Sequence, residues 1–171
     1  MKKFLALLLT CLLCLPVLSC LSASPALALE PEMSKTRSFC ALLDEEGIYY
    51  EFTGKSSSGN EHVCIPFGDD NFTYDINLFF HPDNDMVNLH VWYIITFDDA
   101  DFVPLLRLVN DLNTRYNYTR FYLDETDNTV TCSVTMLLED EDDAADIIME
   151  TVGRLYVILE RAYPELAVYN K

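Results

Sequence analysis

The sequence predicts an α+β fold, in which one antiparallel sheet packs against helices that are segregated from it along the chain. The order of hydrophobic periods supports this class. A helical period comes first, a two-residue period typical of strands follows, and helical periods return twice later. Short segments rich in Gly, Asn and Asp separate the strands, which indicates an antiparallel meander with one buried face. We therefore expect the order α-β-β-β-β-α-β-β-α.

The first half of the fold contains one helix and four strands. The helix is expected to begin at Ser34, to bury Phe39, Leu42 and Leu43, and to end at Gly47. The segments 54–60 (GKSSSGN) and 81–85 (HPDND) have the composition of turns. The residues expected on the buried face of the strands alternate along the chain and are Ile48, Tyr50, Phe52, Val63, Ile65, Phe67, Phe72, Tyr74, Ile76, Leu78, Phe80, Val87, Leu89, Val91, Tyr93, Ile95 and Phe97.

The second half contains two helices and a strand pair. Aspartates at 98–101 favour a helix start, and Asn117 is expected to close this helix in the left-handed conformation. Arg115 and Arg120 are expected to pair with nearby acids, and Pro164 is expected to end the last helix. The apolar stripes are Phe102, Leu105, Leu106, Val109, Leu112 and Tyr116 on one helix, and Ala145, Ile148, Val152, Leu155, Leu159 and Ala162 on the other.

The stretch from Leu105 to Leu137 reads LLRLVNDLNTRYNYTRFYLDETDNTVTCSVTML. It contains a helix with spaced asparagines, a strand of the form R-F-Y-L-D, a hairpin and a second strand. Together with the order of the elements, it resembles the YbjN domain family over roughly residues 34–162. The resemblance implies a fold similar to that of type III secretion chaperones, which bind other polypeptides and are often dimeric. Family members are described as regulators of sensory transduction, and neither catalytic residues nor a cofactor come with the family.

Residues 1–28 have the composition of a signal peptide. Lys2 and Lys3 precede an apolar run at 4–18, and the sequence ALA at 26–28 fits a signal-peptidase site. We expect cleavage after Ala28, a linker at 29–33, and a single secreted or otherwise extracytoplasmic domain at 34–171. Two alternatives keep this domain at a membrane: an uncleaved signal that serves as an anchor, or lipidation of Cys20 in the lipobox-like sequence VLSC.

The chain is strongly acidic, with a formal net charge of −17. Loss of residues 1–28 would change this charge from −17 to −19, because the segment contains two lysines and no acid. Such a charge repels phosphate backbones, so nucleic acid is not an expected partner. The acidic clusters lack the spacing of an EF-hand loop, and the histidines lack zinc-motif spacing, so we expect no metal site and no cofactor. His62 and Cys64 lack an orienting group and an oxyanion site, and we expect no enzyme activity.

Three cysteines follow residue 28. Strand alternation places Cys64 and Cys132 on opposite faces of the sheet, which excludes a bridge between them. Cys40 lies beside the apolar stripe of the first helix and could meet Cys132 in the core. A Cys40–Cys132 disulfide and two buried free thiols are therefore both open.

The same alternation places Tyr49, Phe79, Trp92, Ile94 and Tyr122 on the face of the sheet opposite the core. Aromatic side chains gathered on one sheet face are typical of an interface. Three interpretations are open: contact with another protein or a second copy of the chain, burial beneath a helix of the same chain, and scattered exposure.

The leading hypothesis is an extracytoplasmic, non-enzymatic module that binds proteins as an adaptor or chaperone-like protein, or that regulates signal transduction. The alternative is an extracytoplasmic sensor of a small ligand or cation, with the acidic loops or the sheet face as its site.

Overall fold

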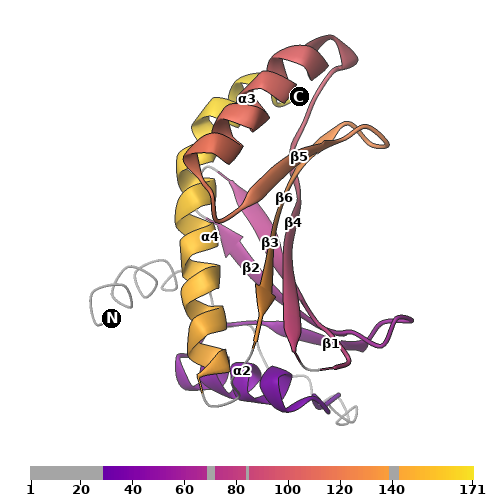
Figure 1. The fold of residues 1–171 in the computed structure, drawn as a ribbon, viewed down its shortest axis with the longest axis vertical. Helices are drawn as coiled ribbons and strands as arrows, with labels where there is room; N and C mark the ends of the chain where they lie inside the picture. The colour runs from indigo at the N-terminus through magenta and orange to yellow at the C-terminus, as the bar shows by residue number, and fades with distance from the viewer. Residues whose placement is uncertain (1–28, 69–71, 84, 139–142) are drawn as a thin grey trace, which may run out of the picture.

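The computed structural model describes residues 29–68, 72–83, 85–138 and 143–171, and it confirms the predicted α+β class. Six antiparallel strands form one sheet in the order β1-β2-β3-β4-β6-β5. Helix α4 runs along this sheet, with α3 near one end of α4 and α2 near the other (Figure 1). The elements are α2 (Ser34–Glu45), β1 (Glu51–Lys55), β2 (Glu61–Gly68), β3 (Thr73–Phe80), β4 (Met86–Thr96), η1 (Asp99–Asp101), α3 (Phe102–Arg115), β5 (Arg120–Asp124), β6 (Thr129–Leu137), α4 (Ala144–Leu166) and η2 (Ala167–Tyr169).

The expected signal segment at 1–28, with Cys20, lies outside the described residues, as do the acidic residues at 69–70 and 139–142. Within the described ranges, no helix combines the length and the apolar composition needed to cross a bilayer.

Helix α2 ends as the sequence predicts, at a glycine that reverses the chain. Gly47 has a φ of 67°, a conformation that costs glycine little because it has no Cβ. Its N–H bonds the carbonyl of Asp44, and the N–H of Ile48 bonds the carbonyl of Leu43 at 2.9 Å. This pair of bonds is a Schellman motif, which satisfies two carbonyls at the end of the helix.

The segment 29–33, expected to be a linker, is attached to the sheet. The carboxylate of Glu61 in β2 is fully buried and accepts hydrogen bonds from the N–H groups of Glu32 (2.7 Å) and Met33 (3.2 Å). Met33 is the residue immediately before α2, so these bonds hold the start of α2 against the sheet. The sequence pattern does not reveal them because the partners are distant in the chain.

The core lies between the sheet and the helices, and the predicted buried stripe of α4 is largely confirmed. Ala144 is fully buried where Ala145 was expected, and the other stripe positions are buried as predicted. The largest fully buried side chains come from every layer of the fold and are Phe39, Phe80, Phe97, Phe121, Leu43, Ile65, Ile76, Leu78, Leu89, Ile95, Leu105 and Leu112.

The prediction that Pro164 ends the last helix is wrong, because α4 continues to Leu166. Proline removes one backbone donor within a helix. Two interactions hold the chain in helical form beyond it. Leu166 is fully buried, and the N–H of Ala167 donates to the carbonyl of Tyr163.

Strand β4 contains a bulge that the hydrophobic pattern does not reveal. Val91 pairs with Cys132, and Ile95 pairs with Val130. Three residues of β4 therefore lie opposite the single residue Thr131. Bulges of this kind bend a strand and re-aim its side chains.

The bulge changes which residues face the core. Tyr93 has a φ of 56°, which is rare for a bulky side chain, and it is 66% exposed although the alternation predicted it to be buried. Ile94, predicted on the opposite face, is only 8% exposed and belongs to the core. Because the bulge adds two residues, the later alternation is unchanged, and Ile95 and Phe97 are buried as predicted.

The corner after α3 also differs from the prediction. Outside glycine, the described residues adopt a positive φ only at Tyr93 and Asn128, so Asn117 is not left-handed. Helix α3 ends instead at Tyr116, which has a φ of −117° and a ψ of 78°, and the N–H of Thr119 bonds the carbonyl of Tyr116 at 3.3 Å.

Asn113 connects α3 to the edge strand β5. Its Nδ2 donates to the carbonyl of Phe121 at 2.8 Å, and its Oδ1 accepts from the N–H of Phe121 at 2.7 Å. The side-chain amide thus takes the place of a neighbouring strand at this edge of the sheet.

The two arginines of this corner behave differently. Arg115 pairs with Asp111 as predicted, at 3.1 Å, and also donates two hydrogen bonds to Glu165 of α4, at 2.7 and 2.8 Å. Arg120 has no ion-pair partner within the described part of the chain, so the expected pair with Asp124 is absent there.

Candidate protein-binding face

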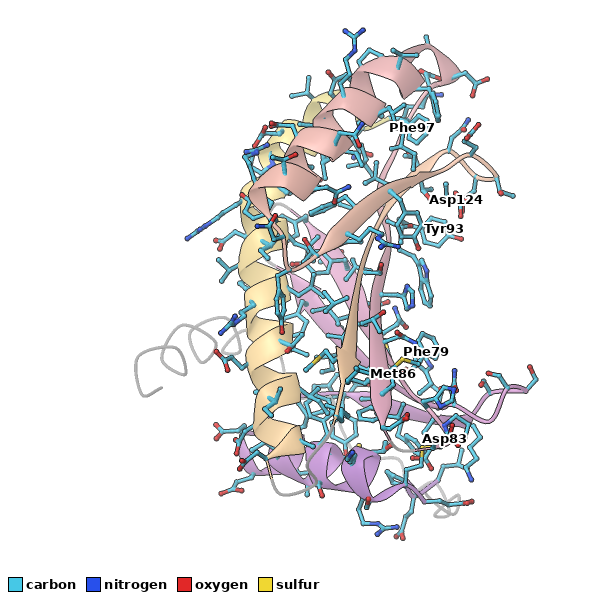
Figure 2. The ribbon with its side chains drawn as sticks, in the orientation of Figure 1. Phe79, Asp83, Met86, Tyr93, Phe97 and Asp124 are labelled. Carbon is cyan, nitrogen blue, oxygen red and sulfur yellow. The ribbon has the colours of Figure 1, made fainter. Side chains whose placement is uncertain are left out.

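Four rings are in contact on the face of the sheet opposite the helices: His62 of β2, Phe79 of β3, and His90 and Trp92 of β4. We call them the ring cluster. His62 stacks on Phe79 with ring centroids 4.5 Å apart, and His90 stacks on Trp92 at 5.5 Å. Phe79 joins the two pairs, because its centroid is 6.0 Å from that of His90 and 5.8 Å from that of Trp92. Phe79 and Tyr93 both point away from the helices (Figure 2).

Strand register places these rings together. His62 and Phe79 are directly opposite in the β2–β3 pair, and Asn77 is opposite His90 in the β3–β4 pair. Directly opposite side chains in antiparallel strands are close enough to pack, and diagonal neighbours are within reach of aromatic rings. The ring cluster is thus built on three adjacent strands near the middle of the sheet.

Hydrogen bonds fix the orientation of His62. Thr53 Oγ1 lies 2.7 Å from its Nδ1, and Asn77 Oδ1 lies 2.9 Å from its Nε2. The amide of Asn77 is itself oriented, since its Nδ2 donates to the carbonyl of Asp75 at 3.2 Å. The amide oxygen can only accept, so Nε2 carries the proton, and in the neutral ring the hydroxyl of Thr53 donates to Nδ1.

His90 contributes mainly an apolar surface. Burial against its neighbours lowers the pKa of its imidazole below the ordinary value of 6.5. Its Nδ1 is buried without a hydrogen-bond partner in the described residues. The ring is therefore neutral at pH 7 and stacks on Trp92 as a flat aromatic plate.

The five predicted residues have different locations. Phe79 and Trp92 belong to the ring cluster, and Tyr122 is partly buried on β5, where burial raises the pKa of its hydroxyl. Tyr49 is exposed ahead of β1 and donates to Glu51 at 2.9 Å; no ring contact joins it to the cluster in the described structure. Ile94 is in the core, so its assignment to the partner-binding face is wrong.

His62, His90 and Tyr93 were not among the residues predicted to bind a partner. His62 and His90 are each adjacent to a buried valine, so the same alternation places them on the face of Phe79 and Trp92. Tyr93 could not be found in this way, because the bulge reverses its direction.

A cavity of about 240 Å³ lies beside the ring cluster. Trp92 and Tyr93 form one side of it, and Asp124 and Asp127 of the β5–β6 hairpin form another. Thr129 and Thr131 complete its lining. We call this space the bulge cavity.

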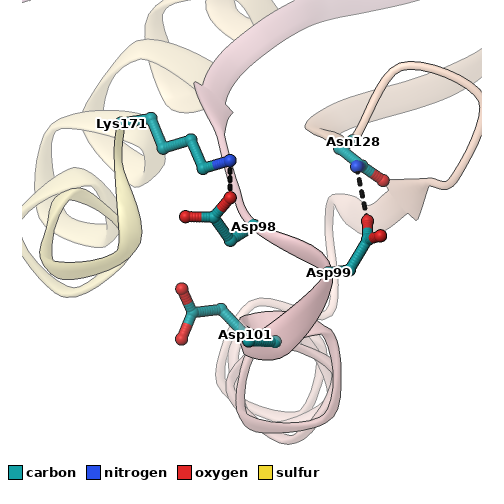
Figure 3. A pocket seen from close by; sticks show the side chains of 6 residues that line it. Asp98, Asp99, Asp101, Asn128 and Lys171 are labelled. Atoms are coloured by element: carbon teal, nitrogen blue, oxygen red, sulfur yellow. Dashed lines mark hydrogen bonds and ion pairs between the residues drawn. The ribbon is translucent and has the colours of Figure 1, made fainter.

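A larger cavity, of about 370 Å³, lies at the start of α3 (Figure 3). Asp98, Asp99 and Asp101 line it. Lys171 forms an ion pair with Asp98, and Asn128 Nδ2 donates to Asp99 Oδ1 at 2.7 Å. The chain thus supplies its own cation to this cavity, and the remaining negative charge stabilises the N-terminus of α3.

The turn between β3 and β4 brings together a histidine and two aspartates. His81 Nδ1 lies 3.4 Å from Asp83 Oδ2 and 3.9 Å from Asp85 Oδ1. One potential ligand atom from each residue lies within 4.8 Å of the others. Imidazole and carboxylate are ligands for divalent metals, so this turn is a candidate cation site that the spacing rules for zinc motifs did not reveal.

The three described cysteines are free thiols, so the structure contains no Cys40–Cys132 bridge. Cys40 and Cys132 are both buried, and burial raises their pKa to about 11 and about 12. Cys64 faces away from the core, and partial burial raises its pKa to about 11. The thiolate is the nucleophilic form of cysteine, and reactive cysteines have a lowered pKa. The raised pKa values keep these three thiols protonated at neutral pH, so they are poor nucleophiles.

The geometry defines a class: a small α+β domain whose antiparallel sheet bears helices on one face and a ring cluster on the other. Among solved structures, the fold is similar to that of YbjN from E. coli, a protein proposed to be a transcription regulator, with a TM-score of 0.52 and 13% identity. The match covers 80% of this chain and 94% of that chain. At this identity the likeness concerns the fold alone, and in that respect the expected YbjN-like architecture is confirmed. No family model and no curated protein matches the sequence.

Proposed function

We propose that this protein is a non-enzymatic regulatory or adaptor module that binds another polypeptide through the ring cluster. The observation that carries the proposal is the uncovered face of the sheet. Helices α3 and α4 lie on one side of the sheet (Figure 1), and Phe79 of the ring cluster points to the other side (Figure 2). The aromatic side chains there are packed against one another rather than beneath a second layer.

The ring cluster has the properties of a binding surface. Trp92 is 39% exposed, which leaves part of a large aromatic ring available to a partner. Tryptophan and tyrosine are enriched among the residues that dominate binding energy at protein interfaces. The cluster is also rigid, because ring contacts and the hydrogen bonds of His62 hold it in place before a partner arrives. A rigid surface loses less conformational entropy on binding.

The proposal includes an extracytoplasmic location, for which the support is the signal-like composition of residues 1–28. The domain would then act either as a released protein or as one held at a membrane by Cys20 or by an uncleaved signal. The molecule that the domain binds there would be another polypeptide or a second copy of the chain.

Crosslinking in the native host, followed by purification of the tagged protein and mass spectrometry, tests the proposal. Trp92→Ala removes the exposed ring, and Leu106→Ala is a matched control, since Leu106 is 42% exposed on α3, away from the ring cluster. We expect a stoichiometric polypeptide, or a second copy of the chain, that is lost in Trp92→Ala and retained in Leu106→Ala. Retention in both variants, or no crosslinked polypeptide at all, would contradict the proposal.

A second candidate function is a cation sensor, favoured by the meeting of His81, Asp83 and Asp85. An ion that binds only the folded state raises its stability by mass action. Thermal unfolding with calcium or zinc would show a saturable rise in Tm that is absent in Asp83→Asn. A rise of equal size in that variant would rule out this turn as the sensor site.

A further inference from the structure

We infer that the bulge cavity is a subsite for the guanidinium or ammonium group of a basic polypeptide partner. This inference rests on the proposed function, because it describes part of the same interface. It identifies the chemistry of the partner residue that would sit next to the ring cluster.

The bulge of β4 creates the aromatic side of the cavity. In a regular strand, Trp92 and Tyr93 would point to opposite faces, and only one of them could line this space. The three-against-one pairing with Thr131 turns both rings outward. The positive φ of Tyr93 costs conformational energy, and such outliers persist where the surrounding structure determines them, often at binding sites.

The β5–β6 hairpin supplies the negative side of the cavity. One carboxylate oxygen of Asp124 accepts from the N–H of Thr126 at 2.9 Å, and one of Asp127 accepts from the hydroxyl of Thr129 at 2.6 Å. These bonds fix the two side chains in place. Within the described residues neither carboxylate has an ion-pair partner, in contrast to Asp98, which Lys171 neutralises.

Two aromatic rings beside two carboxylates favour an organic cation. The face of an aromatic ring attracts a cation, most strongly for tryptophan, and planar guanidinium also forms paired hydrogen bonds with carboxylates. The volume, about 240 Å³, is below that of sites for drug-sized molecules and suits the end of one side chain.

The location of the cavity favours a polypeptide over a free amine. Trp92 lines the cavity and also stacks on His90 in the ring cluster, so the two surfaces are continuous. A residue whose cation fills the cavity would place its chain neighbours over the cluster. The net charge of −17 adds long-range attraction for a basic partner.

Trp92 is the single tryptophan of the chain, so its fluorescence reports directly on this cavity. We would titrate the full chain at low salt with a short arginine-containing peptide and with the same peptide containing citrulline, which is neutral and nearly the same shape. We expect the arginine peptide to bind at least about fivefold more tightly. Equal affinity for the two peptides, or no binding of either, overturns the inference.

Two variants with a matched control locate the effect. Asp124→Asn with Asp127→Asn keeps both local acceptor oxygens and should abolish the preference for arginine. Glu45→Gln with Glu160→Gln removes the same charge from exposed positions on α2 and α4 and should preserve it. A preference that survives the first pair, or is lost equally in both pairs, overturns the assignment to this cavity.

Tyr93→Asn gives an independent readout. Asparagine tolerates a positive φ better than tyrosine does, so this variant should unfold at a higher temperature while binding the arginine peptide more weakly. Unchanged binding in Tyr93→Asn would overturn the role of the ring. Free arginine or choline that binds as tightly as the peptide would show a small-cation site and overturn the polypeptide assignment.

The cationic subsite and the proposed binding through the ring cluster can be refuted independently. If crosslinking to a polypeptide is lost in Trp92→Ala but is unaffected by Asp124→Asn with Asp127→Asn, the ring cluster binds a partner and the cationic subsite is wrong. If the citrulline experiment succeeds and the crosslinked partner is insensitive to Trp92→Ala, the subsite stands and the proposed interface fails.

Discussion

Replacement of Asn113 by alanine should destabilise the fold much more than its partial exposure suggests. The variant removes the donor to the carbonyl of Phe121 and the acceptor from its N–H, which lie at 2.8 and 2.7 Å. Phe121 is 1% exposed, and β5 is the edge of the sheet, so no other strand can replace these bonds. A net hydrogen bond contributes roughly 1 kcal/mol, and a buried group left unpaired costs about 1–3 kcal/mol.

Two lost bonds, partly replaced by water at the sheet edge, give an expected loss of about 2 kcal/mol in the free energy of unfolding. For a chain of this length, that corresponds to a fall in Tm of about 4–8 °C. Urea denaturation followed by circular dichroism measures the free energy, and a calorimetric scan measures Tm.

Asn110→Ala is the matched control, because Asn110 is exposed on the same helix, one turn earlier. Its change in unfolding free energy should be within about 0.5 kcal/mol of zero. Asn113→Asp keeps the acceptor but not the donor, so its free energy of unfolding should lie between those of Asn113→Ala and Asn110→Ala. If Asn113→Ala is no less stable than Asn110→Ala, the side chain of Asn113 does not stabilise the edge strand.

Three further predictions concern other parts of the fold. Glu61→Gln should lower the free energy of unfolding by about 1–2 kcal/mol, since a neutral amide is a weaker acceptor for the backbone of Glu32 and Met33; an unchanged urea midpoint would contradict this. Gly47→Ala should cost about 1 kcal/mol through its positive φ alone, because no atom lies within 4 Å of the added Cβ; a neutral effect in thermal unfolding would refute the strain. Burial raises the pKa of Cys132 from 9.0 to about 12, so the folded state holds its thiol proton more tightly than the unfolded state does. This contribution to stability is complete below pH 9 and is lost as the pH rises toward 12, and in Cys132→Ala the decline in Tm above pH 9 should be smaller.

Much of the fold could be predicted because strand and helix periods depend on burial, and outside the bulge of β4 burial largely follows the expected pattern. Gly47 and the stripe of α4 are examples in which a local pattern and the tertiary structure agree. The failures occur where partners distant in the chain determine the conformation. Asn117 has the residue type that closes helices, but Asn113 holds the corner by bonding Phe121 in the next strand.

The candidate site was only partly predictable for the same reason. Phe79 and Trp92 follow from alternation alone, and His62 and His90 could have been found by the same rule. Tyr93 and Ile94 exchange faces because β4 has two more residues than β6 between matched pairs, and this difference exists only once the two strands are aligned. The bulge cavity therefore has no signature in the sequence of either strand.

The strand order has a consequence for how the chain folds. β1 to β4 are consecutive neighbours and can pair as soon as they are synthesised, but β6 pairs with β4 only after α3 and β5 have been made. Until residue 137 has been synthesised, β4 is an open edge of the sheet. Until α4 has been synthesised, the apolar face of the sheet lacks the helix that runs along it. Chains are made at about 5–20 residues per second, so this exposed intermediate lasts for seconds. Open edges of this kind recruit other strands. Rapid completion of the chain would shorten the interval in which this edge is open to pairing with other chains.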